Sequence, residues 1–105
     1  MAGHFTVVVA DFPESKTTPR AVASVMAYIT VESHGGYKGT VDLTYSCAAD
    51  SGTDPTLNRY SQSLYVDQGN NPTDGVLITG DPGFTFTACG QEQGGPLSDC
   101  DSKHD

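Results

Sequence analysis

The stretch from Val25 to Cys47 reads VMAYITVESHGGYKGTVDLTYSC and contains two alternating runs, separated by the glycine corner His34-Gly35-Gly36. In the second run, apolar side chains recur at every other position and polar ones fill the positions between them. A period of two places one set of side chains in a core and the other set in solvent. The set expected in the core comprises Val25, Ala27, Ile29, Val31, Val41, Leu43, Tyr45 and Cys47. Two such strands joined by a glycine corner predict the start of an antiparallel β-sandwich.

The rest of the chain contains further short runs that are separated by turn residues. Short strands with turn signals at this spacing indicate an all-β sandwich of six to seven strands. Nothing after Gly90 is periodic, so we expect residues 1–90 to form the sandwich and residues 91–105 to form an extended C-terminal tail. The predicted strands cover residues 4–10, 20–33, 37–47, 57–66, 75–79 and 84–89.

Length and charge limit the classes of function. A chain of 105 residues has room for one domain. Thirteen acidic and five basic residues give a net charge of −8, which repels nucleic-acid phosphate. No polybasic segment points to a membrane surface, and no apolar stretch approaches the ~20 residues of a membrane span. The start of the chain lacks the basic region of a signal peptide, so we expect no export signal.

The region around the glycine corner resembles bacterial immunoglobulin-like modules, which carry a Gly-Gly-aromatic-x-Gly-Thr-Val-x-Leu strand corner. Here the corner is Gly35–Leu43, and Ser63–Val66 and Gly75–Thr79 resemble later strands of such modules. The resemblance covers about Ala21 to Thr79, and the loop CAADSGTDPTLNRY departs from it. It implies a single antiparallel immunoglobulin-like β-sandwich. It also implies adhesive or spacing roles on cell surfaces, or roles on phage capsids and tails, with no shared catalytic residue.

Three cysteines allow one disulfide and one leftover thiol. Cys47 shares the core parity, so we expect it to be a buried free thiol. Cys89 has the outward parity of Thr85 and Thr87, within reach of the tail, which favours a Cys89–Cys100 bridge. A Cys47–Cys89 bridge is the alternative, and a reducing compartment would leave three thiols. A zinc site of three cysteines and His104 would have one close ligand pair, Cys100 and His104, whereas structural zinc sites normally use two such pairs.

No nucleophile or metal motif occurs in the sequence, so we expect no enzyme, no catalytic residue, no metal and no cofactor. The loop from Asp67 to Asp74 contains oxygen ligands for calcium, but Pro72 interrupts it and the spacing is not that of an EF-hand. Residues of the Asp and Asn type in such loops more often bond to nearby backbone groups, as we expect here.

Four residues are candidates for contacts with another chain. Met26 and Tyr28 have the parity opposite to the core set, so this strand is apolar on both faces. That pattern fits either a central strand with a partly covered outer face or an interface. Phe5 in the first strand and Phe12 in the arm beyond it are the other two candidates.

Two classes of function are expected, with other protein subunits as partners, either in a homo-oligomer or as a capsid or tail protein, and without nucleic acid or membrane. The first is a phage virion accessory protein, such as a capsid decoration or tail protein, located on the virion. The alternative is an immunoglobulin-like domain of a secreted bacterial surface protein that adheres, binds glycans or acts as a spacer. A third and weaker hypothesis is an acidic inhibitor that mimics nucleic-acid phosphate.

Overall fold

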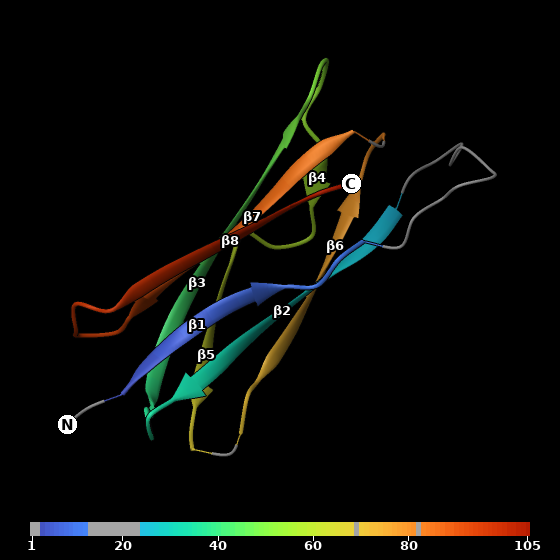
Figure 1. Cartoon of the computed structure of the whole chain (residues 1–105). Coiled ribbons are helices and arrows are strands. Elements are labelled where there is room, and N and C mark those ends of the chain that lie inside the picture. Colours follow the sequence, from blue (N-terminus) through green and yellow to red (C-terminus); the bar gives the residue numbers. More distant parts are fainter. Residues whose placement is uncertain (1–2, 13–23, 69, 82) are drawn as a thin grey trace.

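The computed structural model describes residues 3–12, 24–68, 70–81 and 83–105. Within these ranges the chain is all-β, with strands and no helix (Figure 1). The strands are β1 (His4–Val9), β2 (Ser24–His34), β3 (Gly39–Ala49), β4 (Thr56–Leu57), β5 (Ser61–Val66), β6 (Thr73–Thr79), β7 (Phe84–Glu92) and β8 (Ser98–His104). The predicted strand at residues 20–33 is observed from Ser24 onward, and residues 20–23 lie outside the described ranges.

The strands form two antiparallel four-stranded sheets, which confirms the predicted all-β class and its two-sheet arrangement. Sheet A has the strand order β1-β2-β6-β4, and sheet B has the order β5-β3-β7-β8. Consecutive strands β2 and β3 belong to different sheets, as do β6 and β7, so the chain crosses repeatedly between the two layers (Figure 1). This crossing lets the inner faces of both sheets share one core.

The core follows the predicted parity. Ala27, Ile29 and Val31 of β2 are fully buried, and Val41 and Leu43 of β3 are buried as well. Val25 and Cys47 lie at the margin of the core and are partly buried. The alternation found in the sequence therefore sets which face of each strand meets the other sheet.

The glycine corner carries the chain from sheet A to sheet B. Gly35 and Gly36 have φ angles of 65° and 80°, which are left-handed conformations that glycine adopts at little cost. Directly after them, Tyr37 is buried and its ring packs against Phe5 at a centroid distance of 5.5 Å. The corner thus reverses the chain and anchors it with an aromatic pair.

Phe5 and Phe12 are core residues, so their predicted role as interface residues is wrong. Phe5 is 3% exposed, because it shares the inward parity of its strand with Val7 and Val9. Phe12 is 9% exposed and packs edge-on against the ring of Phe84 at 5.5 Å. Both aromatic side chains contribute to the protein's own core instead of a contact with another chain.

The predicted C-terminal tail also differs from the structure. β7 continues to Glu92, and Ser98–His104 forms β8, which pairs with β7 at the edge of sheet B. The tail prediction failed because both faces of β8 carry polar side chains, so this strand has no hydrophobic period. The predicted strand at 57–66 is likewise interrupted: β4 joins sheet A and β5 joins sheet B.

Candidate interaction surface

The outer face of sheet A carries a group of exposed apolar side chains. Val8, Met26, Tyr28 and Leu77 are 38%, 36%, 51% and 36% exposed, and together they are called the sheet A patch below. Met26 lies opposite Leu77 in the β2–β6 register, and Tyr28 lies opposite Gly75. A side chain at Gly75 would meet Met26 Cε at 2.9 Å and Tyr28 Cε1 at 3.6 Å, so both side chains extend over this glycine. The patch is therefore continuous across neighbouring strands.

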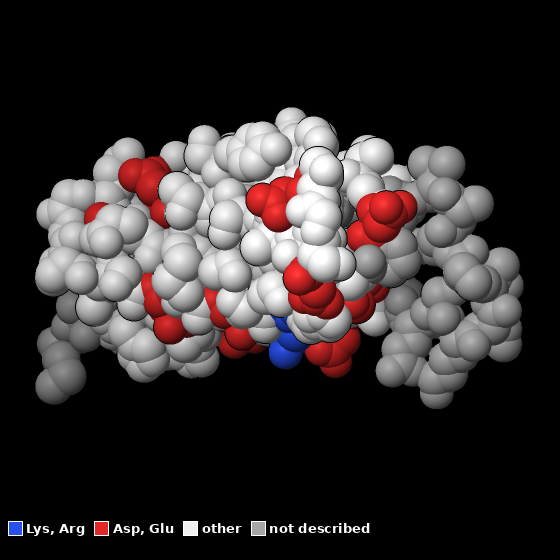
Figure 2. Space-filling view, turned by 90° about the horizontal axis from the view of Figure 1, so that it is seen from above, with Lys and Arg blue, Asp and Glu red and all other residues white. Residues whose placement is uncertain are grey.

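The surroundings of the patch are nearly free of charge. Among the described residues of β1, β2 and β6, the only acidic side chain that shares the outward parity of the patch is Glu32, since Asp74 is buried. The chain as a whole has thirteen acidic residues. Figure 2 shows the molecule from above relative to Figure 1. Acidic side chains are scattered over this side, with little Lys or Arg among them. The outer face of these three strands thus carries little of the acidic charge.

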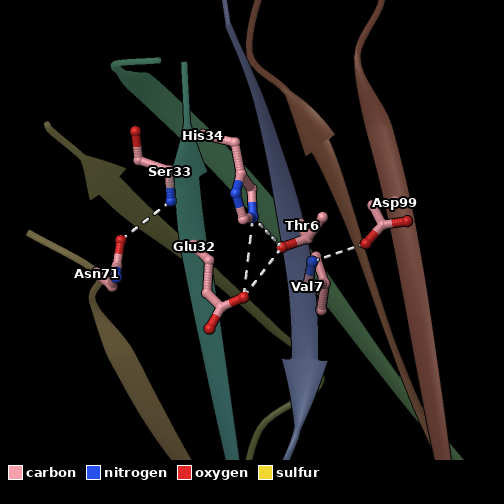
Figure 3. A network of polar contacts seen from close by, with 7 residues as sticks. All are labelled: Thr6, Val7, Glu32, Ser33, His34, Asn71 and Asp99. Atoms are coloured by element: carbon pink, nitrogen blue, oxygen red, sulfur yellow. Dashed lines mark hydrogen bonds and ion pairs between the residues drawn. The ribbon is translucent and has the colours of Figure 1, made fainter. Parts of the chain in front are cut away.

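A polar cluster lies at the end of the same face, where β1 meets β2 (Figure 3). His34 Nε2 is 2.8 Å from Thr6 Oγ1, and Thr6 Oγ1 donates a hydrogen bond to Glu32 Oε1 at 3.3 Å. His4 lies opposite His34 and stacks on its ring, with a centroid distance of 4.9 Å. No local pattern in the sequence predicts that the two histidines meet, because the register between β1 and β2 brings them together.

The geometry of this cluster is not that of an activated nucleophile. In such a site a third group orients the histidine through its other ring nitrogen. Here Glu32 Oε1 is 3.8 Å from Nε2, the same nitrogen that contacts Thr6. The cluster therefore ties β1 to β2 on the surface.

A second polar network lies between the sheets. The Tyr45 hydroxyl donates to Asp74 Oδ2 at 2.6 Å, and Arg59 Nη1 donates to Asp74 Oδ1 at 3.0 Å. Asp74 is 8% exposed, so both carboxylate oxygens are satisfied where water is scarce. Burial, followed by the hydrogen bond and the charge of Asp74, raises the pKa of Tyr45. Sequence reasoning placed Asp74 in a turn, and the structure places it in β6 as a link between the sheets.

The polar side chains between Asp67 and Asp74 bond both locally and to distant strands. Asp67 Oδ1 accepts from the Gln68 backbone N–H at 2.7 Å, which is the kind of local bond expected from the sequence. Asn71 Oδ1 instead accepts from the Ser33 backbone N–H of β2 at 3.0 Å, so this side chain ties the loop to another strand. In the ranges that the structure describes, no three His, Cys, Asp or Glu side chains are arranged to hold a metal ion. No helix of those ranges is long and apolar enough to cross a membrane.

The structure joins Cys89 to Cys100, the pair that the parity of β7 favoured. The two residues lie directly opposite each other on β7 and β8, so the bridge links the edge strand of sheet B to its neighbour. Cys47 is a free thiol, and burial, followed by the charges of Asp54 and Asp105, raises its pKa to about 11.

Two of the four candidate contact residues, Met26 and Tyr28, thus lie exposed on the outer face of sheet A, with Val8 and Leu77 beside them. The sequence missed Val8 and Leu77 because single apolar residues at outward positions are common on protein surfaces. No protein-family model, curated protein or solved structure matches this chain.

Proposed function

We propose that this protein is a non-enzymatic binding module with an immunoglobulin-like fold, which docks on another protein through the sheet A patch. The exposure of Met26 and Tyr28 side by side, on a face with one acidic side chain, is the observation that carries this proposal. Methionine and aromatic side chains are enriched in the cores of protein interfaces, whereas charged side chains are depleted there. Contiguous exposed apolar patches on soluble proteins often mark sites of interaction with other molecules.

The strand order supports the immunoglobulin-like part of the proposal. Immunoglobulin-type sandwiches have the sheet orders A-B-E-D and C′-C-F-G. Sheet A follows the first order with β1, β2, β6 and β4, and sheet B follows the second with β5, β3, β7 and β8. Two features depart from that scheme. β4 precedes β5 in the chain, and the disulfide joins two strands of one sheet instead of bridging the sheets.

The proposed location is outside the cytoplasm of a cell, on a virion as an accessory protein of the capsid or tail. Disulfides persist on virion surfaces, on cell surfaces and in secreted proteins, and Cys89–Cys100 fits such a place. The same bridge also favours the second candidate function, an immunoglobulin-like domain of a secreted bacterial surface protein. In both settings the proposed contact through the sheet A patch is with a protein subunit.

Site-specific photo-crosslinking tests the proposed contact. A benzophenone amino acid replaces Tyr28 in one variant and Tyr65 in the other, since these tyrosines are 51% and 55% exposed on different sheets. Both variants are expressed in the organism that encodes the protein, and purified particles and cell-surface fractions are irradiated. We expect a defined crosslink to a different protein from position 28 and no crosslink to a different protein from position 65. Crosslinks to a different protein from position 65 alone, or from neither position, would contradict the proposal, and the fraction that contains the product separates the two settings.

A further inference from the structure

The two sheets have four edges, and three of them are covered or short. On the β1 edge, the backbone N–H groups of Val7 and Val9 donate to Asp99 Oδ2 at 2.7 Å and Asp101 Oδ2 at 2.8 Å; Figure 3 shows the first of these bonds. These two carboxylates belong to β8, so the β1 edge and the β8 edge cover each other. β4 is only two residues long. Carboxylates and short strands are common means of protecting a sheet edge.

The fourth edge, on β5, is open. The Tyr45 backbone N–H donates to the Tyr60 carbonyl. This bond shows which residues of the β3–β5 ladder direct their backbone groups toward the partner strand. In an antiparallel ladder, alternate residues direct their backbone groups to opposite sides. Gln62 and Leu64 therefore face β3, whereas the backbone groups of Ser61, Ser63 and Tyr65 point away from the sheet. Among the described residues, the only bond recorded for these outward N–H groups is a local one, from Ser63 to Gln62 Oε1 at 3.2 Å.

The composition of β5 does not protect this edge. The strand reads SQSLYV and contains no proline, lysine, aspartate or glutamate. Leu64 faces the core from the edge position and is only partly buried. A strand with these properties is a template for pairing with another strand.

We propose that β5 pairs in antiparallel fashion with β5 of a second copy of this chain, about a two-fold axis at Ser63, so that two B sheets become one continuous sheet. In this register Ser61 lies opposite Tyr65 of the second copy, and Ser63 lies opposite its own equivalent. All of these residues direct their backbone groups outward, so each pair exchanges two backbone hydrogen bonds. The other registers of the same symmetry pair fewer of the three outward residues Ser61, Ser63 and Tyr65 with one another.

The charges near β5 permit this pairing although each copy has a net charge of −8. Arg59 precedes the strand and Asp67 follows it, so antiparallel pairing places opposite charges near one another. The carboxylate of Asp42 accepts a hydrogen bond from Ser63 Oγ at 2.6 Å, one strand away from the edge. The backbone positions of two such residues would be separated by three strand spacings, about 14 Å, and salt with a screening length of ~8 Å weakens the repulsion between their carboxylates.

The contact area of one edge is small, and interfaces below about 1,200 Å² are usually weak or transient. We therefore expect a monomer–dimer equilibrium that shifts toward the dimer at higher protein concentration and higher salt. The occupant is a second copy and not the partner of the sheet A patch, since β5 lies in the other sheet.

Sedimentation equilibrium of the disulfide-bonded protein tests this proposal, from roughly 10 µM to 1 mM, where weak interfaces associate. Ser63→Pro removes the outward N–H without removing a bond to β3, and proline is tolerated at such an edge position. Ser63→Ala is the matched control, because it also lacks the hydroxyl that binds Asp42 but keeps the N–H. We expect the wild type and Ser63→Ala to dimerise and Ser63→Pro to remain monomeric, with a strand-rich circular dichroism spectrum.

Amide NMR of the wild type keeps the test decisive if Ser63→Pro does not fold. The amide signals of Ser61, Ser63 and Tyr65 should shift with protein concentration and become more protected from exchange. A wild type that stays monomeric over the whole range would overturn the proposal. A dimer that persists in Ser63→Pro but dissociates in Met26→Ser would also overturn it, because the contact would then lie on sheet A.

Discussion

The carboxylate of Asp101 accepts a hydrogen bond from the backbone N–H of Val9 at 2.8 Å, across 92 residues of sequence. Asp99 makes the equivalent bond to Val7. The edge of sheet A is therefore bonded to side chains from the edge of sheet B, while each strand keeps its own backbone ladder. One side of the sandwich is closed in this way without a continuous sheet around it.

We predict that Asp101→Ala lowers the free energy of unfolding by about 1–3 kcal/mol, because it leaves the half-buried backbone N–H of Val9 without a partner. Asp101→Asn is the control, since its amide oxygen can still accept this bond, and it should lose less stability. Urea unfolding followed by circular dichroism measures both values. An Asp101→Ala variant as stable as the wild type would show that the bond between Asp101 and Val9 does not hold β1 in place.

Much of the fold could be predicted from the central residues of the sequence. The parity of Ala27, Ile29 and Val31 assigned the inner face of β2, and the parity of Val41 and Leu43 did so for β3. In each case local alternation and tertiary burial agree. The glycine corner was also visible, since two adjacent glycines between alternating runs mark a change of direction.

The remainder depends on contacts between distant parts of the chain. β8 has polar side chains on both faces, and its inward carboxylates bind β1 rather than a core. Phe12 follows the end of β1, and only the position of Phe84 shows that it is buried. His4 and His34 meet because of a strand register that no local pattern encodes. The candidate surface was found in part, through Met26 and Tyr28, because apolar residues on both faces of one strand are unusual.

We predict that Tyr37 makes the fold sensitive to high pH. Burial, followed by the nearby negative charge of Glu92, raises the pKa of Tyr37 to about 12, whereas tyrosine in an unfolded chain titrates near 10. The folded state then holds this proton more tightly than the unfolded state. The contribution of Tyr37 to the free energy of unfolding is therefore complete below pH 10. Stability should fall as the pH rises from about 10 to 12.

The control for this prediction is Tyr37→Phe, which removes the titrating hydroxyl. Chemical unfolding of both proteins at pH 8, 10 and 11.5 should show the wild type losing stability relative to the variant only above about pH 10. The raised pKa of Tyr45 acts in the same direction in both proteins, so their difference isolates Tyr37. A constant difference across this range would contradict the prediction.

We predict that the Cys47 thiol reacts slowly in the native protein. Its pKa of about 11 leaves little thiolate at pH 8, roughly 100-fold less than a pKa of 9 would give, and the thiolate is the reactive form. Iodoacetamide labelling followed by mass spectrometry should modify Cys47 slowly in buffer and rapidly in urea. Fast labelling in the folded state would show that the thiol is not shielded.

The Cys89–Cys100 bridge should stabilise the hairpin of β7 and β8. The cysteines are 11 positions apart, and closing a loop of this size contributes about 3 kcal/mol in the chain-entropy account. The Cys89→Ser, Cys100→Ser double variant is expected to lose about this amount in urea unfolding. Cys47→Ser is the control, since it also removes a thiol but no bridge, and it should lose less.

The last prediction concerns Gly90, a buried residue within β7. A Cβ atom there would lie 2.9 Å from Val41 Cγ1, 3.0 Å from Val7 Cγ2 and 3.1 Å from Phe5 Cε1. These contacts are too close, and the side chains belong to a packed core that has no room to yield. Gly90→Ala should therefore lower the free energy of unfolding by about 1–3 kcal/mol through overpacking.

Gly75→Ala is the matched control for Gly90→Ala, because it adds the same methyl group to a strand on the outer face of sheet A. Its closest contact would be the flexible end of Met26 at 2.9 Å, which is exposed and free to move aside. We expect a change within about 0.5 kcal/mol, as for other surface substitutions. Thermal and urea unfolding of both variants measure the difference. Equal stabilities would mean that β7 does not pack against β1 and β3 as closely as these distances require.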